Sequence, residues 1–297
     1  MHLKKAPMGR NRLSILLFLV PTVALFLLIY GLPLVTLFFT SLFEYRIVPN
    51  RFAFVGLTNY IHLFTQDPLF LKAFGNTMLW VAIHSVFHVA LGVAVALVLA
   101  RKPFGWKFVR TVYMIPNIIS SAALAMIFIN MYNPQYGLIN GFVRLLGFKD
   151  FGQNWLFSDT TAFGSVTLTW FLFAAYTTTL VLGEIAAIPE DIFEAARIDG
   201  ASPFQIDLFV TLPLLRNIIG TTVIMAATYM LQMFDLIYLT TKGGPGDVTM
   251  NLPLYLYKTA LLENNYGYAN TIGALIIIIG IIAMVLITRL FRIGETH

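Results

Sequence analysis

The sequence predicts an all-α membrane protein, folded as a single domain over residues 1–297 with six transmembrane helices. Composition is the first indication, because 58% of the residues are hydrophobic and only 11% are charged. The mean hydropathy of +0.80 is the second, since a water-soluble domain does not tolerate so much apolar surface. The third is that apolar segments of spanning length recur along the whole chain. These observations exclude a water-soluble fold.

Six segments are long and apolar enough to span a membrane, for which about 20 mostly apolar residues are needed. They cover residues 13–34, 74–100, 109–132, 162–187, 217–241 and 269–291. The first segment is too long for a signal peptide and lacks a small-residue cleavage site, so we expect it to be retained. An even number of spans places both termini on one side of the membrane.

The basic residues assign that side to the cytoplasm. Twelve of the 19 Lys and Arg residues, including Lys4, Lys5, Arg10 and Arg12, lie before the first span, after the last span, in the two inner loops, or at the inner ends of two spans. Short cytoplasmic segments of membrane proteins are enriched in Lys and Arg in this way. The net charge of +5 follows from this distribution and forms no single patch suited to nucleic acid. Cysteine is absent, which excludes disulfide and thiol chemistry.

A polar island at residues 189–213 separates the fourth and fifth predicted spans, and we call it the coupling loop for reasons given below. Its sequence is typical of two short helices joined by a sharp turn. Pro189 suits a first helical position, and Gly200 suits the end of that helix. Ser202 and Pro203 then suit the cap and first residue of a second helix.

The charge of this loop is unusual for a cytoplasmic segment. Five acids lie between Glu190 and Asp207, against the single base Arg197. Acidic residues contribute little to membrane orientation, so topology does not account for them. The first helix also presents a narrow face of small residues, which would let another protein's backbone approach closely. An acidic loop with a small face predicts a docking surface for a partner, whereas the plainer interpretation is a solvated connection.

The loop resembles the EAA loop of permease subunits of bacterial ATP-binding-cassette importers. The Glu-Ala-Ala, Asp-Gly-Ala and Leu-Pro elements of that loop follow one another here in the same order. The resemblance implies a type I importer permease fold and a coupling helix that docks into a groove of a cytoplasmic ATPase. We expect acids to meet basic groups there and small residues to permit close approach, although Asp199 alone would also suit local hydrogen bonding. The residues concerned are Glu190, Glu194, Ala195, Ala196, Asp199, Gly200, Ala201 and Pro213.

A second stretch resembles the carbohydrate branch of that family, of the MalF and UgpA kind. It covers residues 234–260, and its turn of Gly243, Gly244, Pro245 and Gly246 followed by Thr249 is distinctive of the sugar permeases. The maltose permease has extra N-terminal helices and a large external domain that have no counterpart here. Contacts of that domain are therefore not carried over to this chain.

The resemblance implies a set of partners as well. No G-x-x-x-x-G-K-[ST] motif occurs, so ATP and Mg are expected in separate ATPase subunits, and this chain is expected to be a transport subunit rather than an enzyme. The expected partners are two cytoplasmic ATPases, an external solute-binding protein, a second homologous permease and membrane lipid. In the sugar branch that second permease is usually a different chain. The expected location is the bacterial cytoplasmic membrane.

Polar and aromatic residues on the helices that flank the coupling loop are candidates for the solute path. Sugars present apolar CH faces between hydroxyls, so aromatic rings with neutral polar groups make a suitable wall. Ordinary helix packing would account for some of them equally well, and Asp235 would also suit a capping role near the outer surface. The candidates are Asn117, Ser121, Thr169, Trp170, Phe173, Tyr176, Tyr229, Gln232, Met233 and Asp235.

Two histidines one turn apart, His84 and His88, raise the question of a metal site. Such a site needs three or four ligands, and no further His or Glu is close in sequence. Polar packing between helices is the better interpretation, and no metal is expected.

Three functions remain to be weighed. An ATP-driven, binding-protein-dependent importer of a sugar or polyol, working by alternating access, fits the coupling loop. A secondary transporter or facilitator is the alternative, but ion coupling would need carboxylates at mid-membrane, and Asp235 and Glu184 both lie near helix ends. An intramembrane enzyme would need a nucleophile and base in a recognisable pattern, such as G-x-S-x-G with a His, and none occurs.

Overall fold

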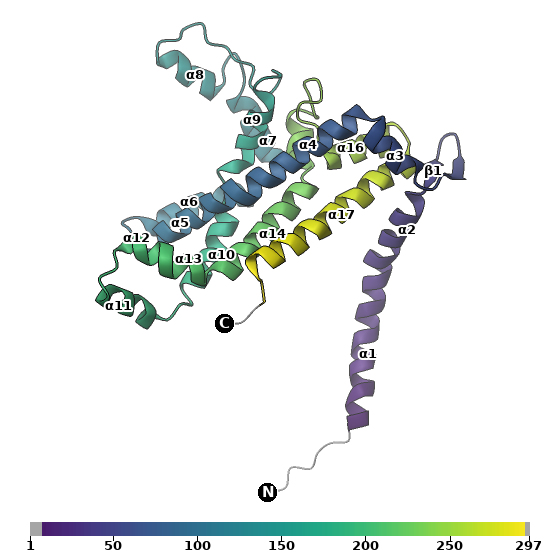
Figure 1. The fold of residues 1–297 in the computed structure, drawn as a ribbon. Coiled ribbons are helices and arrows are strands. Elements are labelled where there is room, and N and C mark those ends of the chain that lie inside the picture. Colours follow the sequence, from purple (N-terminus) through teal and green to yellow (C-terminus); the bar gives the residue numbers. More distant parts are fainter. Residues whose placement is uncertain (1–7, 295–297) are drawn as a thin grey trace.

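Helices make up most of the structure, and between residues 8 and 294 four of them are long and apolar enough to cross a membrane, or six if two bent pairs each count as one span. The computed structural model describes the backbone of residues 8–294 and the side chains of residues 15–294. Lys4 and Lys5, on which part of the topology prediction rests, lie outside the described residues. One end of the bundle carries α11 to α13 and the end of α17, and the opposite end carries α3, β1 and α8 (Figure 1).

The first long helix stands apart from the others. It consists of α1 (Met8–Phe26), the π-helical turn η1 (Leu27–Gly31) and α2 (Leu32–Thr40), and so runs six residues beyond the predicted end at residue 34. None of its most apolar window is buried, and only its α2 end packs against α17. Figure 1 shows α1 diverging from the bundle. Its apolar surface therefore faces lipid or another chain.

The second long helix runs from Pro68 to Ala100 and begins six residues before the predicted start. It comprises α4 (Pro68–Ile83), the π-helical turn η2 (His84–His88) and α5 (Val89–Ala100). The early start has a local cause, because the Asp67 side chain accepts a hydrogen bond from Phe70 N and Pro68 occupies the first helical position.

The third and fifth predicted spans are broken, contrary to the prediction of continuous helices. Residues 109–132 form α6 (Trp106–Ile118) and α7 (Ser121–Met131), which meet at a bend of 101°. Pro116 lies inside the last turns of α6, and Ser120 caps α7 through its hydroxyl. In the fifth segment α14 (Arg216–Gln232) ends where Met233 turns to extended backbone, and α15 (Asp235–Thr240) follows. Apolar length alone does not reveal such breaks.

The fourth and sixth segments lie close to their predicted positions. The fourth runs from Ala162 to Ile185 as α9 (Ala162–Phe171) and α10 (Ala175–Ile185), with a short irregular step between them. The sixth is α17 (Tyr266–Phe291), which begins three residues before the predicted start. A glycine lets the second and fourth segments pack closely, since a Cβ on Gly92 of α5 would lie 2.7 Å from Thr177 of α10.

The connections at the α3 end hold one departure from the all-α prediction. Strands β1 (Phe43–Arg46) and β2 (Arg51–Phe54) form an antiparallel hairpin in which Phe43 pairs with Phe54. Short helices supply the rest of this end. They are α3 (Thr58–Thr65), α8 (Leu138–Leu145), α16 (Leu252–Tyr257) and the π-helical turn η4 (Lys258–Leu262).

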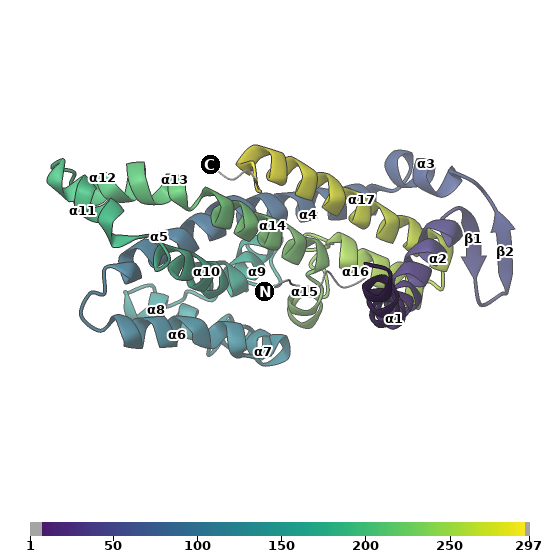
Figure 2. The same cartoon turned by 90° about the horizontal axis from the view of Figure 1, so that it is seen from below.

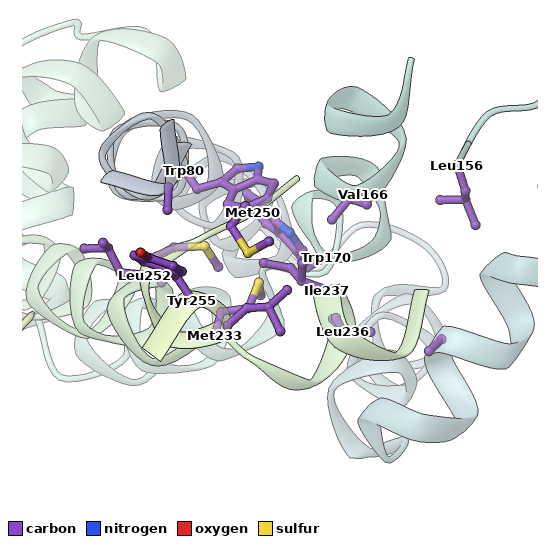
Figure 3. Close-up of a cluster of buried hydrophobic side chains, with 14 of the residues drawn as sticks. Trp80, Leu156, Val166, Trp170, Met233, Leu236, Ile237, Met250, Leu252 and Tyr255 are labelled. Atoms are coloured by element: carbon purple, nitrogen blue, oxygen red, sulfur yellow. The ribbon is translucent and has the colours of Figure 1, made fainter. Parts of the chain in front are cut away.

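The main hydrophobic core lies where α4, α9, α15 and α16 meet. Trp80 of α4 stacks on Phe163 of α9 with ring centroids 4.6 Å apart, and both Met250 and Leu252 are fully buried beside them. Figure 3 shows Trp80, Trp170, Met250 and Ile237 converging on this core. Buried residues of α7 and α15 belong to the same core, so this packing holds the second part of each broken segment in place.

Candidate functional site

The coupling loop folds as the pattern of caps and stops predicts. Helix α11 (Glu190–Ile198) follows Pro189, which is its N-cap rather than its first helical residue. Gly200 ends the turn after α11 with φ +83°, a conformation that glycine adopts without strain. Ser202 and Gln205 then form a capping box around Pro203. The helix that follows is α12 (Pro203–Ile206), η3 (Asp207–Thr211) and α13 (Leu212–Leu214).

The acids of the loop divide into paired and unpaired sets. Glu190 forms an ion pair with Arg197 at 3.2 Å, and Asp207 forms one with Arg101 from the connection between α5 and α6. Within residues 15–294, Asp191, Glu194 and Asp199 have no such partner. Three free acids on a small helix are a surface ready for a basic partner.

The surface of the loop is also apolar in places. No residue of α11 is buried, and Ile198, Phe204 and Phe209 are each more than two-thirds exposed. Figure 1 shows α11 projecting beyond the end of the bundle. Ala195, Ala196, Gly200 and Ala201 lie on or next to this helix, and Pro213 lies inside α13. Large exposed apolar side chains beside small ones and free acids are typical of a docking surface.

A cavity of about 390 Å³ lies within the bundle, and we call it the central cavity. Figure 2 shows α17, α14, α10 and α6 following one another across the bundle, and each helix packs on the next. The last three of these helices and the π-helical turn η2 all contribute residues to the cavity wall. Its lining residues are His84, His88, Pro116, Asn117, Ile119, Ser121, Leu124, Trp170, Phe173, Tyr176, Thr177, Leu180, Thr222, Met225, Ala226, Tyr229 and Leu236.

The central cavity forms where the helices are irregular. The π-helical turn η2, the bend between α6 and α7, and the step between α9 and α10 all contribute lining residues, and the helices on both sides of the step between α14 and α15 contribute Tyr229 and Leu236. In a membrane, irregular backbone is tolerated where it lines a cavity or is buried in protein, because its polar groups need partners. The breaks therefore shape the site rather than interrupting it.

Side chains from neighbouring segments satisfy the backbone groups that these breaks release. At the step after α9, His88 Nδ1 donates to Phe171 O at 2.8 Å, and Ala174 N donates to the Tyr113 hydroxyl at 3.1 Å. At the step after α14, Asn251 Nδ2 donates to Met233 O at 2.5 Å. A buried carbonyl without a partner would cost about 1–3 kcal/mol, so each of these residues stabilises a break.

Six of the ten residues predicted for the solute path line the central cavity. These are Asn117, Ser121, Trp170, Phe173, Tyr176 and Tyr229. The other four lie elsewhere: Thr169 is buried and donates to Val166 O at 2.6 Å, Met233 is buried in the main core, and Gln232 and Asp235 are exposed outside the cavity. The breaks explain part of the difference, because a helical period carried across a break assigns the wrong face. Gln232 lies in the same unbroken helix as Tyr229, so no break accounts for its position.

His84 and His88 line the cavity although the sequence favoured simple packing for them. Their rings stack at 3.9 Å, and Trp170 meets the His84 ring edge to face at 4.9 Å. Two buried nitrogens in this cluster, His84 Nδ1 and Trp170 Nε1, have no hydrogen-bond partner in the described part of the chain. Across residues 15–294, no group of three or more His, Asp or Glu residues is placed to hold a metal ion.

The Gly243 to Gly246 turn is held in place by residues of α4. Lys72 Nζ donates to Gly246 O at 2.6 Å, and Asn76 Nδ2 donates to the carbonyls of Val248 and Met250 at 2.9 and 2.8 Å. Thr249 closes the turn through its hydroxyl, which donates to Gly244 O at 2.8 Å. The turn lies outside the central cavity, at the end of the molecule opposite the coupling loop.

A buried carboxylate near α3, which the sequence did not indicate, joins three segments. Asp67 accepts hydrogen bonds from the hydroxyls of Tyr255 at 2.5 Å and Tyr268 at 2.7 Å, and Tyr268 also contacts His62 Nδ1 at 2.9 Å. Burial and the neighbouring carboxylate raise the pKa of Tyr255. The cluster ties the start of α4 to α16 and α17, and no short motif marks residues so far apart in sequence.

Comparison with known proteins supplies a family for this arrangement. The sequence profile of the family described as "Binding-protein-dependent transport system inner membrane component" matches residues 88–293. That range includes the coupling loop and nearly all of the cavity wall.

Individual relatives cover almost the entire chain. The multiple sugar-binding transport system permease protein MsmF of Streptococcus mutans is 34% identical, over 90% of this chain and 91% of its own. The sulfoquinovosyl glycerol transport system permease protein SmoG of Agrobacterium fabrum is 30% identical, over 95% and 91%. A chain in the crystal structure of a bacterial alginate ABC transporter, bound to its alginate-loaded periplasmic protein, has the same fold with a TM-score of 0.83 at 19% identity. The match covers 96% of this chain and 98% of that one.

Proposed function

Because this chain belongs to the family of binding-protein-dependent transport system inner membrane components, we propose that it is the transmembrane subunit that moves a sugar through an ATP-driven importer. The chain is a transport subunit and not an enzyme. The sugar class rests on relatives whose names specify sugar or glycoside transport and on the aromatic, neutral polar wall of the central cavity.

The observation that carries this proposal is the position of the coupling loop between two walls of the cavity. Helix α10 contributes Tyr176, Thr177 and Leu180 to the wall and leads directly into the loop. Helix α14 contributes Met225 and Tyr229 and leads directly out of it. A force on α11 would therefore reach both walls through continuous backbone, which is what coupling of ATP hydrolysis to alternating access requires.

The proposed cycle follows from that connection. ATP and Mg²⁺ bind to two separate ATPase subunits, which accept α11 and its unpaired acids Glu194 and Asp199. Closure of the ATPases moves the coupling loop and opens the central cavity outward, toward a sugar-loaded binding protein. Hydrolysis then returns the cavity to the inward-facing state. Within residues 15–294 no acid lines the cavity, which leaves an ion-coupled transporter without the buried carboxylate that it would need.

The proposed topology has six spans and cytoplasmic termini. It counts the bent pair α6 and α7 as one span, and the bent segment that ends with α14 as another. Placing the coupling loop in the cytoplasm then puts the hairpin, α3, α8 and the Gly243 to Gly246 turn on the outer face. A second, homologous and different permease would complete the translocation path and cover the exposed surface of α1.

The test compares sugar-stimulated ATPase activity of the complete reconstituted importer carrying native chain with that carrying Glu194→Lys plus Gly200→Trp. A Cβ at Gly200 meets nothing within 4 Å in this chain, so a side chain there begins in open space, although the backbone φ of +83° is strained for any residue but glycine. We expect stimulation to fall by about tenfold or more while the variant still inserts in the membrane.

The matched control is Glu263→Lys plus Gly147→Trp at the opposite end. Gly147 also has a positive φ, of +107°, and open space around its Cβ, so the backbone strain is comparable. Glu263 is exposed like Glu194. Retained stimulation in the control with loss in the coupling-loop variant supports the proposal, and unchanged stimulation in both contradicts it.

A further inference from the structure

We infer that the central cavity admits uncharged sugars and rejects acidic ones, an inference that rests on the proposed sugar-import function. Family membership leaves this point open. SmoG is named for a glycoside that bears a sulfonate, and the similar fold of known structure belongs to a transporter of the acidic polysaccharide alginate. MsmF is named for multiple sugars. The residues that line the central cavity bear directly on this point, because they form this chain's share of the solute path.

The wall carries no group able to pair with an anion. In the described part of the chain, no Lys, Arg, Asp or Glu lines the cavity. A carboxylate or sulfonate that enters such a site loses its hydration without gaining a counter-ion, which is strongly unfavourable. Asp235 is exposed and directly precedes the lining residue Leu236, so its negative charge would repel an acidic sugar further.

The wall does carry neutral groups that match hydroxyls. Asn117, Ser121, Tyr176 and Tyr229 bring an amide and three hydroxyls, from α6, α7, α10 and α14 respectively. Each of these groups both donates and accepts hydrogen bonds, as a sugar hydroxyl does. Their spread over four helices places hydrogen-bonding groups on different sides of the cavity.

The histidine pair belongs to this neutral set. The backbone carbonyl of Phe171 can only accept, so His88 donates to it from Nδ1, and an uncharged ring then offers Nε2 as an acceptor. The rings of His84 and His88 stack at 3.9 Å, a separation at which two imidazolium cations would repel each other strongly. The unpartnered indole nitrogen of Trp170 and Nδ1 of His84 add hydrogen-bonding capacity without charge.

Aromatic rings complete the match to a neutral sugar. Trp170, Phe173, Tyr176 and Tyr229 line the same cavity as the polar groups, so its wall combines aromatic rings with hydrogen-bonding groups. The volume of about 390 Å³ is within the range of sites for small organic ligands, about 300–1,000 Å³. The wall therefore suits the alternating CH faces and hydroxyls of one or two neutral sugar units.

The test measures ATP-driven uptake by the complete importer in proteoliposomes. Maltotriose, cellotriose and raffinose serve as neutral probes, and trigalacturonate and a glucuronate-containing disaccharide serve as acidic probes. Each uptake rate is divided by the fraction of the binding protein that carries the probe. This normalisation corrects for the selectivity of the binding protein. We expect uptake of at least one neutral probe. Both acidic probes should be taken up at no more than about one tenth of that rate.

A charge introduced into the wall sharpens the test. Asn117→Lys places an ammonium group in the cavity, and we expect it to raise the acidic-to-neutral uptake ratio about tenfold. Asn130→Lys is the matched control, because Asn130 is exposed on α7 and does not line the cavity. It should leave the ratio unchanged.

The outcomes separate this inference from the function on which it rests. Uptake of an acidic probe by the native importer at the rate of a neutral one or faster overturns the inference and leaves the importer intact. An acidic-to-neutral uptake ratio that is the same for Asn117→Lys and Asn130→Lys also overturns the inference. No ATP-driven uptake of any sugar, acidic or neutral, overturns the proposed function itself.

Discussion

The coupling loop and the central cavity are built in opposite ways. The loop's residues lie within 25 consecutive positions, 189–213, and α11 has no buried residue of its own. The wall of the cavity is drawn from residues 84–236 and forms where several helices are irregular. A docking surface can be local because its partner supplies the other half. A cavity between helices needs several segments, and the surrounding structure must also stabilise the irregular backbone that lines it.

This difference decides what the sequence predicts. Caps and stops act over three or four residues, so Gly200, Ser202 and Pro203 indicated the two loop helices correctly. The hydrogen bonds that stabilise the helix breaks join residues far apart in the chain, such as His88 with Phe171 or Asn251 with Met233. No periodicity within one helix contains that information.

Closing the cavity should have the largest effect. Ser121→Trp places a large ring at the cavity wall while leaving the coupling loop untouched. We expect sugar uptake by the complete importer to fall by about 100-fold, because a filled cavity has no room for the solute. The measurement is uptake of radiolabelled sugar into proteoliposomes loaded with ATP.

The control for this variant is Gly164→Trp. Gly164 is exposed on α9, and a Cβ there meets nothing within 4 Å. Uptake should remain near the native rate. Equal losses in both variants would mean that Ser121 does not border the solute path.

Removing a hydrogen bond that stabilises a helix break should lower the stability of the fold, whereas a change in the coupling loop should not. Asn251 is buried, donates to Met233 O and caps Leu254 N at 3.1 Å. Asn251→Ala should lower the free energy of unfolding by about 1–3 kcal/mol, because it leaves a buried carbonyl without a partner. The shift in Tm of the purified chain in detergent reports this loss, with the exposed Asn130→Ala as control. A shift no larger than that of the control would remove the proposed role of Asn251.

A loop residue should show the reverse pattern. Asp199 is exposed and forms no ion pair within residues 15–294. Asp199→Ala should change the free energy of unfolding by about 0.5 kcal/mol or less and still reduce sugar-stimulated ATPase activity several-fold. Measuring Tm and ATPase activity on one preparation distinguishes the two effects. Loss of stability without loss of stimulation would assign Asp199 to the fold instead of the docking surface.

The smallest effect is expected where the loop is tied to its own chain. Arg101 pairs with Asp207 and also donates to Pro203 O at 3.3 Å, but its side chain is half exposed. Exposed ion pairs contribute about 0–1 kcal/mol, so Arg101→Ala should lower Tm only slightly. A double-mutant cycle with Asp207→Ala measures the coupling between them. A coupling energy well above 1 kcal/mol would make this pair a main support of the loop.

The motif residues show a further limit of sequence-based prediction. The resemblance to the sugar permeases includes Thr249 but assigns it no role. In the structure Asn76 and Thr249 hold the Gly243 to Gly246 turn, and the Thr77 hydroxyl accepts from Leu252 N at 3.0 Å. A resemblance identifies residues that belong to one motif. The hydrogen bonds that give these residues their structural roles depend on how α4 packs on α16.

The central claim is that the loop and the cavity work as two ends of one ATP-driven pathway. The most direct measurement is sugar accumulation in proteoliposomes that hold the complete importer, compared with proteoliposomes that hold this chain alone. The account predicts accumulation against a gradient only with the ATPase subunits and ATP present. Uptake by this chain alone at a comparable rate would contradict it and would identify the protein as a facilitator.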